Sequence, residues 1–112
     1  MIPVGLILKI AGIIIAALSV GALIYLTVKL SISFLKKYRQ KKGTKILAAK
    51  VKDIIKNAPT KKLDDLPDEE DVIIAEYDDE EDKLVQDITV ARDIDIRVEE
   101  ILESNGGIVV FE

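Results

Sequence analysis

The chain has 112 residues, a length that suits one small domain. It contains no Cys and no His, which excludes disulfides, a thiolate nucleophile and the usual zinc ligands. The net charge is −4, but residues 1–62 carry thirteen basic side chains and one acidic one, whereas residues 63–112 carry three basic and nineteen acidic ones. This asymmetry predicts that the two halves have different surroundings. The many Ile residues are typical of a prokaryotic or viral source.

The longest apolar run is IAGIIIAALSVGALIYLTV, residues 10–28, which contains no charge. A helix of this length would extend about 28 Å, close to the hydrocarbon thickness of a bilayer. We therefore expect a transmembrane helix in an N-terminal part, residues 1–35. One alternative is a buried core helix, for which the remaining chain is small. The other is a signal peptide cleaved near residues 19–22, which the apolar segment before Lys9 disfavours.

Basic residues on the two sides of this run predict its orientation. Only Lys9 precedes it, whereas seven basic residues follow it closely, so we expect the N-terminus outside and the C-terminus in the cytoplasm. The membrane-flanking set is Lys9, Lys29, Lys36, Lys37, Arg39, Lys41, Lys42 and Lys45.

Small residues recur inside the run at a spacing of four, which lets two helices approach closely. These candidate helix-packing positions are Gly12, Ala16, Ala17 and Gly21. They predict self-association as an option for this helix.

The next segment, residues 36–60, is basic and predicts an amphipathic helix from about Thr44 to Asn57. Apolar residues recur there with a period near 3.6, and Pro59 ends the pattern. Such a helix could lie on the inner leaflet, where its Lys residues would meet anionic lipids, or pack on the C-terminal part. Nucleic acid is a less favoured partner, because only one aromatic residue lies among these cations and no nucleic-acid-binding motif is present.

An acidic linker, residues 61–71, leads to a small acidic module, residues 72–112. We expect a strand at 72–77, a strand or a helix at 84–92, a helix ending near Ser104, and a last strand at 108–111. The order β-β-α-β gives a small α+β module. The chain after Ser104 turns at SNGG, which suits a left-handed glycine rather than a phosphate-binding loop.

The acidic module is too small to form a stable core alone, since about 40 to 60 residues without disulfides or metals are marginal. We therefore expect a second copy, a partner protein or the basic helix to complete it. The last strand offers a candidate partner edge, formed by Ile108, Val109, Val110 and Phe111.

The predicted fold class is a single-pass α-helical membrane protein with an N-terminal transmembrane helix, a juxtamembrane basic amphipathic helix and the small C-terminal α+β module. The sequence contains no catalytic constellation, so we expect no enzyme, no cofactor and no metal. The predicted function is a membrane anchor or scaffold subunit in the lipid bilayer, whose cytoplasmic tail binds a partner protein or self-assembles. The alternatives are a small holin-like or toxin-like pore former and a structural membrane protein of a virus particle.

Overall fold

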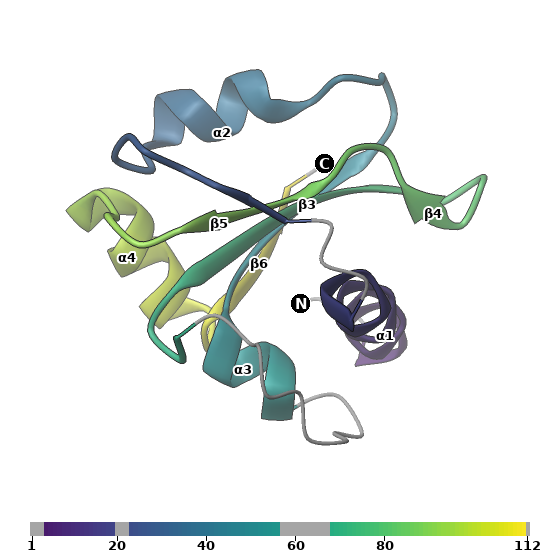
Figure 1. The fold of residues 1–112 in the computed structure, drawn as a ribbon, viewed down its shortest axis with the longest axis horizontal. Coiled ribbons are helices and arrows are strands. Elements are labelled where there is room, and N and C mark those ends of the chain that lie inside the picture. The colour runs from purple at the N-terminus through teal and green to yellow at the C-terminus, as the bar shows by residue number, and fades with distance from the viewer. Residues whose placement is uncertain (1–3, 20–22, 57–67, 112) are drawn as a thin grey trace.

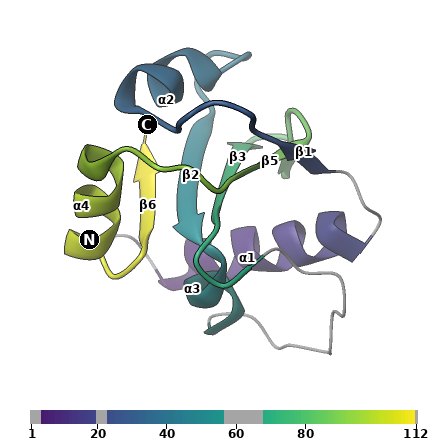
Figure 2. The same ribbon diagram turned by 60° about the vertical axis from the view of Figure 1, so that its left-hand side comes forward.

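The computed structural model describes residues 4–19, 23–56 and 68–111. They form a mixed six-stranded sheet with helices on both of its faces, as Figures 1 and 2 show. The elements in chain order are α1 (Val4–Ser19), β1 (Leu23–Tyr25), α2 (Ile32–Tyr38), β2 (Lys45–Lys50), α3 (Val51–Lys56), β3 (Val72–Asp78), β4 (Lys83–Leu84), β5 (Ile88–Ala91), α4 (Ile96–Ser104) and β6 (Ile108–Phe111).

The strands lie in the order β1-β5-β3-β2-β6, and the short strand β4 pairs separately with β3. Strand β2 runs antiparallel to β3 on one side and to β6 on the other. Strand β5 lies antiparallel to β3 and parallel to β1. A strand from the basic half of the chain is therefore inserted between two strands from the acidic half.

Residues in the central strands alternate between two apolar cores, one on each face of the sheet. In β2, Leu47 and Ala49 face the core that α1 and α3 cover, whereas Ile46 and Ala48 face the core beneath α2 and α4. Because both faces are covered, β2 and β3 carry apolar side chains at most positions, on both faces of the sheet. The molecule thus has a helix–sheet–helix layering (Figure 1).

Local sequence signals set the ends of the helices on the second face. Ser31 caps α2 by accepting a hydrogen bond of 3.1 Å from the backbone N–H of Phe34. Asp95 caps α4 in the same way, with a bond of 2.8 Å from the N–H of Arg97. After α4 the chain turns through Gly106 and Gly107, which have φ angles of +73° and +88°.

The prediction of a single-pass transmembrane protein is wrong. The run 10–28 is not one helix, because α1 ends at Ser19 and the chain enters β1 at Leu23. Within the described ranges, every helix is too short or too polar to cross a bilayer. The apolar residues serve internal packing instead, since Ala11 and Ile14 are fully buried against the sheet. The predicted topology, with the N-terminus outside and the C-terminus cytoplasmic, is corrected by the same finding.

The predicted amphipathic helix from Thr44 to Asn57 is also wrong, because its first half is the strand β2 and, among its described residues, only 51–56 are helical. The apolar residues with a period near 3.6 include Leu47, Val51 and Ile54. These three residues do face one core, but Leu47 does so from a strand and the other two from the helix that follows it. A strand is normally recognised by alternating apolar and polar residues. The strand segment ILAA shows no such alternation, because both of its faces are buried and all four residues are apolar.

The acidic half contains the elements expected between residues 72 and 111, with β4 in addition. The ambiguous segment forms a strand at Ile88–Ala91. The acidic module, residues 72–112, is completed by the chain itself, since β2 lies between β3 and β6. The expected order was therefore missing the central strand that holds the module together.

Candidate binding surfaces beside strand β6

Most of the predicted membrane-flanking cations take part in contacts within the fold. Ion pairs join Lys9 to Asp82 at 3.1 Å, Lys29 to Asp93 at 4.0 Å, Lys45 to Asp79 at 3.6 Å, and Lys41 to Asp78. Each of these cations comes from the basic half and each carboxylate from the acidic half. Exposed ion pairs stabilise a fold by only about 0 to 1 kcal/mol each. They nevertheless explain the charge asymmetry, because the two halves face each other in one sheet.

The basic turn between α2 and β2 is organised around a buried carboxylate, that of Glu76 in β3. Its oxygens accept hydrogen bonds from the backbone N–H groups of Gln40 at 2.8 Å and Lys41 at 3.0 Å. The amide of Gln86 donates at 2.7 Å, and the hydroxyl of Thr44 lies 2.7 Å away. Burial alone would raise the pKa of Glu76, but these hydrogen bonds outweigh it and hold the pKa below its usual value.

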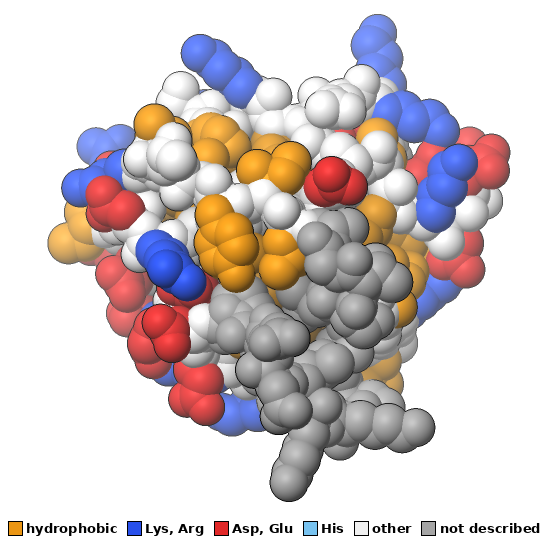
Figure 3. Space-filling view, viewed as in Figure 1, with side chains coloured by type: hydrophobic (Ala, Val, Ile, Leu, Met, Phe, Trp, Pro, Cys, Tyr) orange, Lys and Arg blue, Asp and Glu red, His pale blue; other side chains and the backbone are white. Residues whose placement is uncertain are grey.

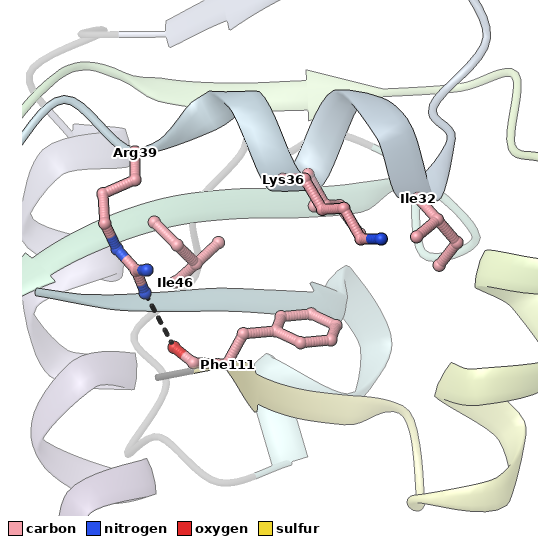
Figure 4. A pocket seen from close by; sticks show the side chains of 6 residues that line it. Ile32, Lys36, Arg39, Ile46 and Phe111 are labelled. Atoms are coloured by element: carbon pink, nitrogen blue, oxygen red, sulfur yellow. Dashed lines mark hydrogen bonds between the residues drawn. The ribbon is translucent and has the colours of Figure 1, made fainter.

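A groove of about 270 Å³ lies between α2 and the adjacent ends of β2 and β6 (Figure 4). Its lining is Ile32, Leu35, Lys36, Arg39, Ile46 and Phe111. Four of these side chains are apolar and two are cationic. The groove therefore combines an apolar wall with positive charge, and none of the described residues that line it is acidic.

Arg39 is held in place at this groove by three hydrogen bonds. Its guanidinium donates to the hydroxyl and the carbonyl of Thr44 at 3.2 and 2.9 Å, and to the carbonyl of Phe111 at 3.4 Å. These bonds use Nε and one terminal nitrogen, so the other terminal nitrogen retains its donors among the described contacts. Figure 4 shows Lys36 one turn away from Ile32 on α2, above the ring of Phe111.

Strand β6 forms one edge of the sheet and, within the described ranges, pairs only with β2. The N–H of Lys50 donates to the carbonyl of Gly107 at 2.9 Å. In an antiparallel pair, hydrogen-bonded and non-hydrogen-bonded residues alternate, so this bond determines which residues of β6 bond to β2. Val109 consequently directs its N–H and C=O toward β2. Ile108 and Val110 direct theirs away from the sheet, at the strand where the sequence predicted a partner edge.

Three of the four predicted helix-packing residues lie in the described part of α1. Gly12 and Ala16 are exposed on α1, whereas Ala17 packs against the core. Gly21 lies outside the described residues. Among the flanking cations, Lys36, Lys37 and Lys42 are exposed and make no ion pair with the part of the chain that the structure describes.

A second hollow of about 330 Å³ lies on the other side of α2, over β1 and β5. Its wall includes Ile24, which is 51% exposed, together with Lys37 and the amides of Gln40 and Gln86. In Figure 3 apolar side chains gather on the face that β1 crosses in Figure 1. This hollow is larger than the groove beside β6, and more of its lining side chains carry polar groups.

Sequence reasoning did not find Glu76 or the groove. A lone Glu within VIIAEYD is a detectable signal, because a charged residue inside a buried strand needs hydrogen-bonding partners. The groove gave no such signal, since its residues come from α2, β2 and β6.

In the described ranges no group of three or more acidic residues is arranged to hold a metal ion. Comparison with known proteins found no matching family model, no similar curated protein and no similar solved structure. The described surfaces include an open strand edge at β6 and a groove lined by two cations and four apolar side chains.

Proposed function

We propose that this protein is an assembly module whose sheet is extended by pairing β6 with β6 of a second copy. The observation that supports the proposal is the edge position of β6, whose ladder alternation turns the N–H and C=O groups of Ile108 and Val110 outward. Outward backbone groups on an apolar strand are a template for another strand.

The edge is self-complementary, as a twofold dimer requires. In an antiparallel pair centred on Val109, Ile108 of one copy lies opposite Val110 of the other. Both residues direct their backbone groups outward, so each of these two pairs can exchange a full set of hydrogen bonds. The facing side chains are apolar and β-branched, a favourable cross-strand combination.

The test compares two substitutions at one position. Val110→Pro removes the outward N–H, whereas Val110→Ala removes most of the side chain and keeps that N–H. Proline is tolerated at an edge where its missing N–H faces outward, so Val110→Pro keeps the fold. Val109→Pro should instead destabilise the fold, because its N–H points into the ladder with β2.

Native mass spectrometry and light scattering over a range of concentrations provide the readout, with circular dichroism to verify folding. We expect a dimer for the parent protein and for Val110→Ala, and a folded monomer for Val110→Pro. A parent protein that stays monomeric up to millimolar concentration, or a Val110→Pro variant that still dimerises, would overturn the proposal. Pairing with a strand of a different protein would show as a heteromeric complex that Val110→Pro abolishes in the absence of any homodimer.

A further inference from the structure

We propose that the groove beside β6 binds a small apolar monocarboxylate. The apolar tail lies against Ile32, Ile46 and Phe111, and the carboxylate lies between Lys36 and Arg39. This inference concerns the α2 side of β6 and does not depend on pairing at its outer edge.

The distribution of charge favours an anion. The chain as a whole is acidic, with a net charge of −4, and two cations near this region, Lys41 and Lys45, are paired with the carboxylates of Asp78 and Asp79. In the groove, by contrast, Lys36 and Arg39 are the only charged side chains among the described residues that line it. Lys36 has no ion pair in the described part of the chain, so its charge is available to a ligand.

The position of Arg39 favours a carboxylate in particular. Its bonds to Thr44 and to the carbonyl of Phe111 fix the guanidinium before any ligand arrives, which reduces the ordering cost of binding. A planar guanidinium with free donors on one terminal nitrogen matches the oxygen atoms of a carboxylate.

The size and wall of the groove favour a short apolar tail. Its volume of about 270 Å³ lies just below the range of about 300 to 1,000 Å³ that is typical of small-molecule sites. Four apolar side chains supply the wall, and the two cations are Lys36 on α2 and Arg39, which directly follows that helix (Figure 4). The second hollow is a less suitable site, because its single cation is accompanied by two amide side chains.

The experiment titrates the full chain with octanoate and follows the amide and methyl NMR signals of the groove residues. Two comparators separate the parts of the ligand: octylammonium has the same tail with the opposite charge, and acetate has the same head group without the tail. We expect saturable shifts of the Ile32, Leu35 and Ile46 signals with octanoate, and weaker binding of both comparators by at least about tenfold. Equal binding of octanoate and octylammonium would overturn the proposal, as would octanoate shifts confined to other parts of the molecule.

A matched pair of variants tests the cation. Lys36→Gln removes the lysine of the groove, and Lys37→Gln makes the same change one position along α2, where the side chain lines the second hollow. We expect Lys36→Gln to weaken octanoate binding about threefold to tenfold and Lys37→Gln to leave it within about twofold of the parent. Equal effects of the two substitutions would contradict the site. Because both lysines are exposed, both variants should fold.

Discussion

The backbone N–H of Gln40 donates a hydrogen bond of 2.8 Å to the carboxylate of Glu76, which lies thirty-six residues later in the chain. This contact brings the basic turn after α2 onto the strand β3. The same carboxylate accepts from the N–H of Lys41, so two consecutive backbone donors share one anion. A buried charge therefore contributes to holding this turn against the sheet.

Glu76→Gln should lower the free energy of unfolding by about 2 kcal/mol or more. The substituted amide keeps one acceptor, but its NH2 group faces donors, and buried donors without acceptors cost about 1 to 3 kcal/mol each. Urea denaturation at neutral pH measures the change. Glu100→Gln is the matched control, because Glu100 is exposed on α4, and it should change the stability by less than about 0.5 kcal/mol. Equal effects of the two substitutions would show that the turn does not depend on the carboxylate.

The lowered pKa of Glu76 predicts acid sensitivity with a defined sign. Burial raises this pKa, but the hydrogen bonds from Gln40, Thr44 and Lys41 outweigh burial and lower the pKa below the usual value of a glutamate carboxyl. The corresponding stabilisation is fully present above the unfolded pKa and is lost as the pH falls through the folded pKa.

Denaturation at a series of pH values from about 7 to 3 measures this loss. The pKa values of Asp78 and Asp82 are also lowered, by hydrogen bonds from Lys41 and Tyr77 respectively, so the parent protein should lose stability in acid for several reasons. The difference in the free energy of unfolding between the parent and Glu76→Gln isolates the contribution of the Glu76 carboxyl. It should shrink as the pH falls below about 4, and a constant difference would contradict the account.

The two glycines after α4 should respond differently to alanine. Gly106 has a φ of +73° and open space where a Cβ would stand, so Gly106→Ala should cost about 1 kcal/mol from backbone strain alone. At Gly107, with a φ of +88°, the new Cβ would collide with the Asp53 carboxylate in α3. Gly107→Ala should therefore cost about 1 to 3 kcal/mol more.

A double-mutant cycle with Asp53→Ala tests the cause of that difference. If the carboxylate produces the extra cost, the effect of Gly107→Ala should fall toward that of Gly106→Ala in the Asp53→Ala background. Additive effects of the two substitutions would show that Asp53 moves aside without penalty.

Strands β3 and β6 and helix α4 were accessible to sequence reasoning because each has a strong local pattern. VIIAEY and IVVF are short β-branched runs, and α4 lies between a capping Asp and a Gly pair. These signals depend on a residue and its near neighbours, so they do not require knowledge of the remaining fold.

The central strand β2 and the role of the first apolar run could not be predicted from the sequence, because both depend on long-range contacts and not on a local pattern. ILAA fits a helix stripe and a doubly buried strand equally well, and only its neighbours β3 and β6 decide between them. The apolar run 10–28 satisfies the length rule for a membrane span, but the rule does not consider whether a sheet can bury it. The contacts of Ala11 and Ile14 with that sheet are long-range and leave no local signal.

The candidate surfaces show a similar division. The partner edge was proposed from IVVF alone, and the structure places these residues at an edge of the sheet. The groove combines Lys36 and Arg39 with Phe111, seventy-two residues after Arg39, and a single sequence carries no sign of that proximity.

The central claim is that β2 from the basic half lies in register between strands of the acidic half. The chain has no cysteine, so an introduced pair reports on one contact only. Ala48 and Ile74 are register partners on the same face, and the bond from the N–H of Val51 to the carbonyl of Asp71 makes theirs a non-hydrogen-bonded pair. Their Cα atoms should lie about 4.5 Å apart, within disulfide range.

The decisive measurement is disulfide formation under mild oxidation at low protein concentration, read by peptide mass spectrometry. Ala48→Cys with Ile74→Cys should form an intramolecular disulfide in nearly all molecules. Ala49→Cys with Ile74→Cys, shifted by one residue to the opposite face, should form little. Equal yields for the two pairs, or no disulfide in either, would place residues 45–50 outside the sheet and contradict the fold on which both binding surfaces depend.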